Sequence, residues 1–511
     1  MVEYKVLITT SGLGSRLGEL TNYTNKALIR VADKPAISYI IESYPKDIEF
    51  IITLGHFGSH VKQFLQLAYP NHNFTFIEID NYKGLGSSLG YSLLQCKHNI
   101  NSPFIFHASD TIITNYNPEY PNKNYIIGSY KDDPAQYRTL HINENKLINI
   151  NEKGELNFDY LYIGVAGIKD FELFFYNLEK LINNWHEDTS DVHAINSMLS
   201  EVSFIKKEVN GENWFDIGNT TELNKTRKIF QSHIEVLDKV DESIFFFDNF
   251  IIKFFSNSTI SKNRVTRALN LGNLVPNMLD STENFYKYQK AEGKLFSKSV
   301  NSESFNKFLK WTETNLWVET LDANFKDKCY DFYITKTKQR VAQYLKNNKE
   351  NNQINEQNIP GIYDLIDSID VDWLCDGLPS QFHGDFILDN VIETNDGFCL
   401  IDWRQDFAGD LEIGDKYYDL AKLNHNLTVN HDIVSKNLFN PSSNNCYILT
   451  NSTLNECKEI LHSFITENLY DLKKVRILTS LIWINMAPLH EYPFNNFLFN
   501  FGKYNLFKNL K

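Results

Sequence analysis

The sequence lacks the cysteine patterns that zinc sites and disulfide frameworks need. Its six cysteines include no C-x-x-C pair and follow no regular spacing, which argues against both and favours a reducing compartment. Positive charge is also scarce, with 50 Lys and Arg against 64 Asp and Glu, and a formal charge of −14. Because most of such a surface repels phosphate backbones, generic binding to nucleic acid or to anionic membranes is not expected.

Long apolar runs are missing as well. The candidates at 244–255 and 477–489 are too short or too interrupted to cross a bilayer. The opening residues MVEYKVLITTSG predict a short buried strand rather than a signal peptide. We therefore expect a cytoplasmic protein without membrane insertion, and its 511 residues should form two or three domains.

The first half predicts alternating strands and helices. Short β-rich runs at 5–10, 50–54, 74–79 and 103–108 are separated by amphipathic segments. This order indicates an α/β fold, a Rossmann-like and mostly parallel sheet with flanking helices. Ligands bind such sheets beyond the carboxyl ends of the strands. The glycines of GLGSR follow the first strand directly, where their backbone N–H groups can approach a triphosphate.

The stretch GLGSRLGELTNYTNKALIRVADKPAISYIIE, which begins at Gly12, resembles the signature of sugar nucleotidyltransferases, particularly the bacterial phosphocholine cytidylyltransferases. Later segments (YKGLGSSLGYSL, FHASD and NWFDIGNTTEL) extend the resemblance across about residues 1–230. Asn25 stands where the family commonly has proline. The resemblance implies nucleotide binding by Gly12, Gly14, Ser15, Gly84, Gly86 and Ser87, catalytic cations at Arg16 and Lys26, and Mg²⁺ binding by Asp110 and Asp216.

After about residue 231 the pattern changes. It predicts a strand hairpin within 243–257, a further strand at the start of 285–296, and amphipathic helices in much of 302–345 and 452–485. A small β-rich lobe before a helical lobe is the layout of a kinase-like α+β bilobal domain. The motifs HGDFILDN and LIDWRQDFAGD resemble the aminoglycoside phosphotransferase and choline kinase family over roughly 240–500.

This second resemblance implies a phosphotransferase site. Asp385 would accept or orient the proton of the attacking hydroxyl, Asn390 and Asp402 would hold Mg²⁺ on the ATP phosphates, and Lys253 would contact those phosphates. We interpret His383 as a structural brace of the loop. The segment 239–252 lacks the glycines of a phosphate loop, and Arg404 stands where the family most often has Glu.

The sequence thus predicts a nucleotidyltransferase domain at 1–230 and a kinase-like domain at 240–511, joined by a linker near 231–240. The expected function is bifunctional: ATP phosphorylates a small alcohol or polyol, and CMP from CTP is then transferred to the phosphate, giving a CDP-activated alcohol for capsule or surface glycan decoration. Choline, ethanolamine, polyols such as glycerol or a hexitol, and amino-acid derivatives all remain open as acceptors. One alternative is a sugar kinase joined to a sugar-phosphate nucleotidyltransferase that uses GTP, UTP or dTTP. Another is an active transferase with a regulatory pseudokinase half.

The alcohol site and the oligomeric state are left open by the sequence. The segment 481–494 is a candidate for acceptor contacts, with His490 and Glu491 as hydroxyl-binding side chains, although an ordinary helix terminus explains it equally well. Homo-oligomerisation is compatible with the pattern.

Overall fold

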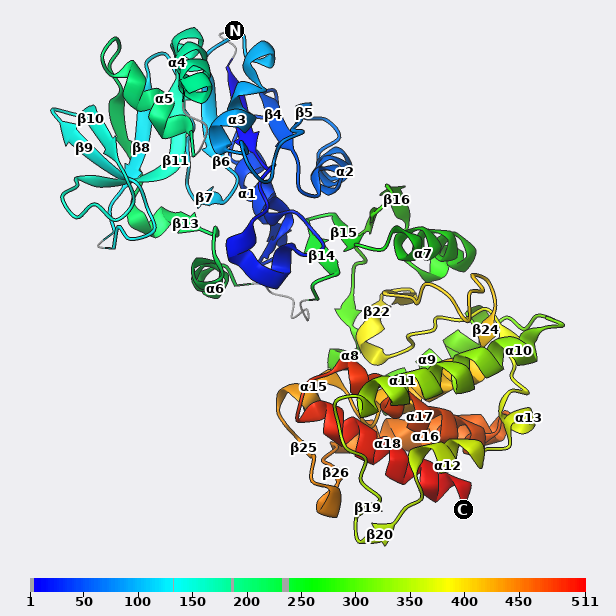
Figure 1. Cartoon of the computed structure of the whole chain (residues 1–511). Coiled ribbons are helices and arrows are strands. Elements are labelled where there is room, and N and C mark those ends of the chain that lie inside the picture. Colours follow the sequence, from blue (N-terminus) through cyan, green and yellow to red (C-terminus); the bar gives the residue numbers. More distant parts are fainter. Residues whose placement is uncertain (1–3, 132, 185–187, 232–238) are drawn as a thin grey trace. The chain divides into compact units, whose positions relative to one another are not determined.

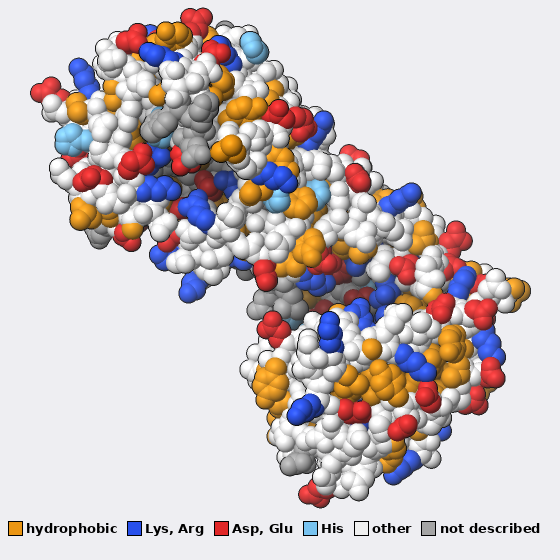
Figure 2. Space-filling model, viewed as in Figure 1, with side chains coloured by type: hydrophobic (Ala, Val, Ile, Leu, Met, Phe, Trp, Pro, Cys, Tyr) orange, Lys and Arg blue, Asp and Glu red, His pale blue; other side chains and the backbone are white. Residues whose placement is uncertain are grey.

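The computed structural model describes residues 4–131, 133–184, 188–231 and 239–511, so the predicted linker near 231–240 falls largely outside the described residues. The chain divides into two compact units (Figure 1), Met1–Ser258 with Asp280–Lys287 and Thr259–Leu279 with Tyr288–Lys511. Acidic, basic and apolar side chains are interspersed over the face shown in Figure 2. Within the described residues, no helix is long and apolar enough to cross a membrane.

A nine-stranded sheet forms the centre of the first unit, in the order β5-β4-β1-β6-β11-β8-β12-β10-β9. Its strands are β1 (Lys5–Thr9), β4 (Glu49–Leu54), β5 (Asn73–Glu78), β6 (Phe104–Ala108), β8 (Tyr125–Ser129), β9 (Thr139–Asn143), β10 (Lys146–Asn151), β11 (Tyr160–Ile168) and β12 (Ile205–Glu208). The four strands expected from the sequence form its parallel part, β5-β4-β1-β6. The remainder is mixed, because β11 runs antiparallel to both β6 and β8. The expectation of a mostly parallel sheet therefore holds for the first four strands only.

A tight hairpin explains part of this difference. Strands β9 and β10 are joined by Glu144 and Asn145, which have positive φ angles of 46° and 64°. Two successive positive φ values are typical of the two-residue type I′ turn, which forces antiparallel pairing. The chain then crosses back so that β12 pairs parallel to β8.

Helices cover both faces of the sheet. On one face α1 (Ala36–Glu42) and α2 (Gly58–Ala68) pack on side chains such as Val6 and Ile8. On the other face α3 (Leu89–Leu94), α4 (Phe171–Asn184) and α5 (Asp191–Met198) pack on side chains that include Leu7. Successive residues of β1 thus point to opposite cores, as expected for a strand that is buried on both faces.

The predicted hairpin within 243–257 is present as β14 (Glu242–Phe246) and β15 (Phe250–Phe255). Its aromatic side chains join the core beneath α2, where the ring centroids of Phe245 and Phe64 lie 5.4 Å apart. The hairpin is accordingly part of the first compact unit. Short elements complete that region: β2 (Arg30–Val31), β3 (Lys34–Pro35), β7 (Thr111–Ile113), β13 (Trp214–Asp216) and α6 (Thr220–Ile229).

Helices dominate the second unit, as the sequence predicts for 302–345 and 452–485. The longer ones are α7 (Ser258–Leu271), α9 (Ser302–Asn315), α10 (Phe325–Tyr330), α11 (Lys336–Leu345), α14 (Lys416–Asn426), α16 (Ser452–Glu467), α17 (Leu472–Met486) and α18 (Phe494–Leu510). Helix α17 is central and packs against α14, α11 and α18. A small sheet accompanies them, formed by β18 (Lys294–Leu295), β22 (Val391–Thr394) and β23 (Gly397–Leu400). The predicted strand at 285–296 is β17 (Phe285–Gln289).

Candidate functional site

Two aspartates meet at one edge of the first unit. Asp110 directly precedes β7, and Asp216 ends β13, which pairs antiparallel with β7 so that Asp216 lies opposite Thr111. The backbone N–H of Ile217 donates to the carbonyl oxygen of Asp110 at 3.0 Å. This pairing brings together two carboxylates that are far apart in the sequence, and both were predicted to bind Mg²⁺.

The predicted cationic residues, Lys26 and Arg16, lie next to these two carboxylates. Lys26 Nζ lies 2.9 Å from Asp110 Oδ2. A Cβ atom placed on Gly218 would lie 3.0 Å from Asp216 Oδ1, 3.1 Å from Arg16 Nη2 and 3.4 Å from Asp110 Oδ2. The structure therefore brings Asp110, Asp216 and Arg16 together around Gly218, with Lys26 paired to Asp110.

The two carboxylates differ in their electrostatic state. Burial raises the pKa of Asp110, but Lys26 and Arg16 outweigh burial, so that this pKa lies below its usual value. Burial and the nearby charge of Asp110 raise the pKa of Asp216. Two adjacent carboxylates that disfavour each other's ionisation are suited to a divalent cation. Within the described residues no group of three or more His, Cys, Asp or Glu gathers around a metal position. A cation held here would take its other ligands from phosphate oxygens and water, as Mg²⁺ prefers.

The predicted nucleotide loops lie at the surface of this unit. Gly14 has a φ of 68°, and a Cβ atom on it would lie 3.0 Å from Lys26 Cβ, so the glycine brings the loop close to the lysine. Gly12 and Ser15 flank this residue and are exposed. In the second loop, Gly84 and Gly86 also have positive φ, and Ser87 Oγ donates to the carbonyl oxygen of Gly84 at 2.7 Å.

Asn25, which departs from the family pattern, is a structural residue of the first loop. It is fully buried. Its Nδ2 donates to the carbonyl oxygens of Thr10 at 2.7 Å and His56 at 2.6 Å, and its Oδ1 accepts from the N–H of Ala27 at 2.9 Å. The amide thereby ties the segment before Lys26 to the ends of β1 and β4.

Sequence reasoning missed several residues near the carboxylates. Burial, Arg16 and Arg138 lower the pKa of Lys153, which also senses the charges of Asp110 and Asp216. Lys153 follows the end of β10, and the topology of the sheet is the signal that could have pointed to it.

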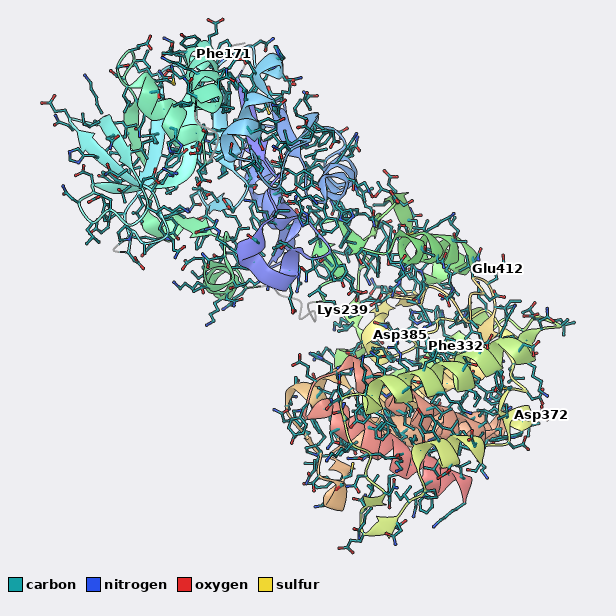
Figure 3. The ribbon with its side chains drawn as sticks, in the orientation of Figure 1. Phe171, Lys239, Phe332, Asp372, Asp385 and Glu412 are labelled. Atoms are coloured by element: carbon teal, nitrogen blue, oxygen red, sulfur yellow. The ribbon has the colours of Figure 1, made fainter. Side chains whose placement is uncertain are left out.

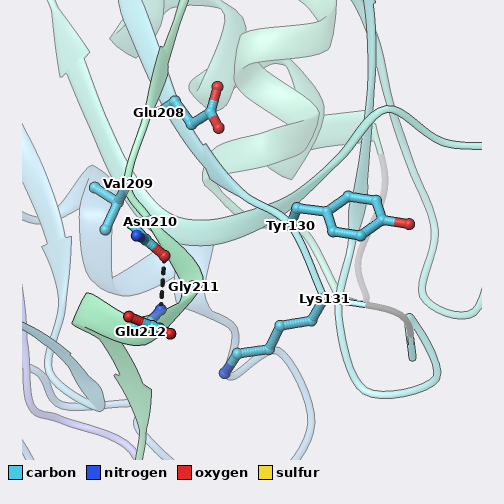
Figure 4. A pocket seen from close by; sticks show the side chains of 7 residues that line it. All are labelled: Tyr130, Lys131, Glu208, Val209, Asn210, Gly211 and Glu212. Carbon is cyan, nitrogen blue, oxygen red and sulfur yellow. Dashed lines mark hydrogen bonds between the residues drawn. The ribbon is translucent and has the colours of Figure 1, made fainter.

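The first unit also has an open hollow (Figure 4). It lies where the parallel neighbours β8 and β12 end, and it is lined by Tyr130, Lys131, Glu208, Val209, Asn210, Gly211 and Glu212. Lys131 Nζ lies 3.9 Å from the centroid of the Trp214 ring, two residues before Asp216. The Tyr137 ring packs edge-to-face on Trp214 at 4.9 Å. Lys131 and Tyr137 were not predicted from the sequence.

In the second unit, Asp385 and Asn390 lie on one loop that ends in a 3-10 turn, η7 (Leu388–Asn390). Asn390 Nδ2 donates to Asp385 Oδ2 at 3.1 Å and to its carbonyl oxygen at 2.9 Å. Lys422 Nζ, from α14, lies 2.7 Å from Asp385 Oδ1. Burial raises the pKa of Asp385, but Lys422 outweighs it and holds this pKa below its usual value. The pairing with Lys422 was missed because α14 carries no motif.

Asp402 follows β23 and belongs to the same electrostatic neighbourhood. Its charge acts on Asp385, and it forms an ion pair with Arg264 of α7. Its φ of 57° is uncommon for a residue other than glycine and indicates a constrained turn. Asn390 Oδ1 accepts no hydrogen bond from the described residues. Together these oxygens are ligand types that Mg²⁺ accepts.

Buried side chains hold the loop that bears Asp385 in place. His383 is fully buried, its Nε2 lies 3.0 Å from the carbonyl oxygen of Ile401, and its Nδ1 accepts from the N–H of Asp385 at 3.3 Å. The carboxylate of Asp419 accepts the N–H groups of His383 at 2.8 Å and of Gly384 at 2.7 Å. With both ring nitrogens engaged by backbone groups, His383 has the geometry of a brace.

Three further contact residues were predicted, namely Lys253, His490 and Glu491. Lys253 lies on β15 of the first unit and is 7% exposed. Within 481–494, α17 ends at Met486 and a 3-10 turn ends at Leu489, so that His490 and Glu491 follow the helix terminus. This geometry is the one expected for an ordinary helix end and brings neither residue into a described contact with Asp385.

Comparison with known proteins identifies the class that the first unit resembles. No family model matches the chain. The N-terminal half of the chain matches sugar-phosphate nucleotidyltransferases. The chain is 25% identical over 256 residues to the bifunctional protein GlmU of Methanococcus vannielii, which covers 48% of this chain and 60% of that protein.

A further curated relative and two solved structures show how far this likeness extends. A bifunctional sugar-1-phosphate nucleotidylyltransferase/acetyltransferase of Sulfurisphaera tokodaii is 27% identical over 234 residues, covering 43% of this chain and 55% of that protein. Among solved structures, the CTP:phosphocholine cytidylyltransferase of Streptococcus pneumoniae is 21% identical, covers 45% of this chain and 100% of its own, and has a TM-score of 0.39. The inositol-1-phosphate CTP transferase of T. maritima is 15% identical, covers 46% and 99%, and has a TM-score of 0.37. The chain thus spans about 60% of the length of the first curated relatives, and each likeness covers less than half of the chain.

Proposed function

We propose that the protein is a bifunctional enzyme that phosphorylates a small alcohol with ATP and then transfers CMP from CTP to the resulting phosphate. The observation that carries the transferase half is the convergence of Asp110, Asp216 and Arg16 around Gly218, with Lys26 paired to Asp110. The likeness of the N-terminal half to sugar-phosphate nucleotidyltransferases supports it.

Nucleotidyl transfer does not require the protein to supply a general base. A phosphate monoester is largely ionised at neutral pH, so its oxygen attacks the α-phosphorus of CTP without a general base. A P–O bond forms, the bond between the α-phosphorus and the bridging oxygen breaks, and pyrophosphate leaves with the electron pair. Arg16 and Lys26 offset the negative charge of the phosphates, and Asp110 and Asp216 would hold Mg²⁺, which supplies further positive charge at the reacting phosphates. Gly12, Gly14 and Ser15 would approach the triphosphate, while Gly84, Gly86 and Ser87 would face the nucleoside.

Phosphorylation of an alcohol needs a proton acceptor, and Asp385 has that role in this proposal. The alcohol oxygen attacks the γ-phosphorus of ATP, ADP leaves, and the hydroxyl proton passes to Asp385. Lys422 keeps Asp385 ionised, and the amide of Asn390 fixes its second oxygen. Asn390 and Asp402 would hold Mg²⁺ on the ATP phosphates, with Lys253 as a further predicted phosphate contact.

One observation favours a second candidate. The curated relatives include a protein described as acting on sugar-1-phosphates. A sugar kinase joined to a sugar-phosphate nucleotidyltransferase using GTP, UTP or dTTP would fit the same residues.

Phosphorus NMR of the products tests these assignments directly. The protein is incubated with MgATP, one of CTP, GTP, UTP or dTTP, and a panel of alcohols and sugars. A diphosphate diester formed with CTP and an alcohol supports the proposal, whereas a diester formed only with a sugar and another triphosphate supports the second candidate.

Two variants assign the steps and serve as controls for each other. Asp385→Ala should abolish alcohol-dependent ADP formation but leave pyrophosphate release from a supplied phospho-alcohol, and Asp216→Ala should do the reverse. Unchanged ADP formation in Asp385→Ala would reject the role of Asp385, whereas no alcohol-dependent ADP formation by the wild type would leave a single active transferase with a regulatory second unit.

A further inference from the structure

Three basic side chains, which we call the basic cluster, gather beside the loop of Asp385: Lys336, Arg340 and Arg404. Lys336 and Arg340 are one turn apart on α11 and share one face of that helix. Lys336 Nζ lies 4.0 Å, and the guanidinium carbon of Arg404 5.0 Å, from the centroid of the Phe332 ring. The ring therefore holds cations from two separate elements next to each other.

Phe332 also connects the basic cluster to the lysine that binds Asp385. Its ring packs edge-to-face on Tyr418 at 4.8 Å. Tyr418 and Lys422 are one turn apart on α14, and Lys422 forms the ion pair with Asp385. Burial, followed by the charges of Arg404, Arg340 and Lys422, lowers the pKa of Lys336. The cations are thus close enough to repel one another. Figure 3 labels Phe332 and Asp385, which both belong to the second unit.

The charge of Asp406 acts on Lys336, but no carboxylate is paired with the basic cluster in the described part of the chain. Among the described residues, none of its three side chains forms an ion pair with Asp or Glu. Arg340 donates to the Gln343 side chain at 3.0 Å, and Arg404 Nε donates to the backbone oxygen of Asp406 at 3.0 Å. The carboxylate of Asp406 accepts from the N–H of Gly409 at 3.1 Å. Clustered cations without counter-charges are unfavourable unless an anion binds among them.

The local backbone also departs from regular helix at this point. A π-helical turn, η6 (Asp331–Thr335), lies between α10 and α11 and carries Phe332. Such turns insert extra backbone into a helix and often occur at functional sites. Here the turn directly precedes Lys336, the first residue of α11.

The contacts of Lys336 and Arg404 with Phe332 connect the basic cluster to the hydroxyl side of the site, although Arg404 lies only two residues after Asp402. Asp402, the predicted metal ligand, forms an ion pair with Arg264 of α7. The basic cluster instead contacts the elements around Lys422, which holds the proposed proton acceptor Asp385. An acceptor alcohol whose hydroxyl faces Asp385 would place its remaining groups next to these cations.

We propose that the alcohol phosphorylated by the second unit carries a carboxylate or phosphate group, which the basic cluster binds while the hydroxyl faces Asp385. This inference rests on the proposed kinase function and narrows its substrate class. Cationic acceptors such as choline and ethanolamine would be repelled by the basic cluster, which leaves hydroxy acids and phosphorylated polyols as the favoured class.

Matched three-carbon alcohols provide the test. ADP formation from MgATP is measured with the full-length protein and glycerol, glycerate or glycerol phosphate, with choline and ethanolamine as cationic comparisons. We expect kcat/KM for one anionic compound to exceed that for glycerol at least tenfold, and the two anions distinguish a carboxylate from a phosphate. A preference for glycerol, choline or ethanolamine would overturn the proposal.

Variants separate acceptor binding from nucleotide binding. Arg404→Gln and Lys336→Gln should raise KM for the anionic alcohol at least tenfold and leave KM for ATP unchanged, whereas Lys338→Gln is the matched control. Lys338 lies on α11, and its ion pair with Asp367 lies at the surface. An increase confined to KM for ATP would show that the basic cluster binds nucleotide and would refute the inference.

A binding measurement tests the inference even if no alcohol yields ADP. Calorimetry with glycerate and with glycerol phosphate compares the wild type with Arg404→Gln. Binding that is lost in the variant would support an anion site even though the kinase proposal had failed, and equal binding in both proteins, or none in either, would refute it.

Discussion

Replacing Arg267 by methionine should destabilise the second unit and disable the loop of Asp385. Arg267 lies on α7, is 1% exposed, and its guanidinium donates to the carbonyl oxygens of Phe382, His383 and Arg404. The guanidinium carbon also lies 3.8 Å from the centroid of the Phe382 ring. One buried side chain therefore joins the segment before Asp385 to the segment after Asp402.

The expected magnitude follows from the acceptors that the substitution leaves behind. The carbonyl oxygen of His383 keeps the N–H of Arg404 at 3.0 Å. Those of Phe382 and Arg404 accept no other hydrogen bond from the described residues. Two unsatisfied buried carbonyls cost about 1–3 kcal/mol each, and methionine roughly preserves the volume. We expect a loss of about 4 kcal/mol, with a smaller loss for Arg267→Lys, which retains a charged donor.

Urea unfolding followed by tryptophan fluorescence measures this loss. Most tryptophans lie in the second unit, namely Trp311, Trp317, Trp373, Trp403 and Trp483. Arg476→Met is the matched control, because Arg476 is exposed on α17 and its removal should change stability by less than about 0.5 kcal/mol. ADP formation should fall in Arg267→Met while pyrophosphate release persists. If Arg267→Met unfolded at the same urea concentration as the control, the bracing argument would be wrong.

Three further perturbations address the first unit and the metal sites. Asn25→Ala removes the donors to two backbone oxygens and should destabilise the first unit by about 2–4 kcal/mol, measured by urea unfolding; a wild-type midpoint would contradict the role given to this amide. Gly218→Ala places a methyl group 3.0 Å from Asp216 Oδ1 and should lower pyrophosphate release at least tenfold with ADP formation unchanged; equal rates would argue against a ligand at that position. Removal of Mg²⁺ by EDTA should abolish both activities and excess Mg²⁺ should restore them, so activity that persists in EDTA would refute the carboxylate assignments.

Strand positions in the first unit were predictable because they depend on local pattern. The runs at 50–54 and 103–108 are continuous and apolar, as buried parallel strands are, and they appear as β4 and β6. The hairpin of β9 and β10 was missed. Its turn residues, Glu144 and Asn145, do not include the glycine that usually marks such a turn.

The sites were predictable only where a motif carried them. Asp385 and Asn390 lie within one short loop, so their proximity follows from the sequence itself. Lys422, Lys336 and Arg340 come from helices without a motif, and their approach to that loop is a tertiary property that periodicity does not encode. The same limit applies to Lys153, whose position depends on how β10 is placed within the sheet.

The two candidate sites use carboxylates in opposite ways, and the difference follows from their proposed nucleophiles. In the first unit the nucleophile is a phosphate that is already ionised, so Asp110 and Asp216 need only bind a cation. Burial and the charge of Asp110 raise the pKa of Asp216, and a bound cation would offset both effects. In the second unit the nucleophile is an alcohol, so one carboxylate must stay ionised and accept its proton. Burial raises the pKa of Asp385, but the ion pair with Lys422 outweighs burial and keeps this carboxylate ionised, although as a weaker base. Consecutive steps on one chain would thus begin at the site that deprotonates an alcohol and end at the site that needs no base.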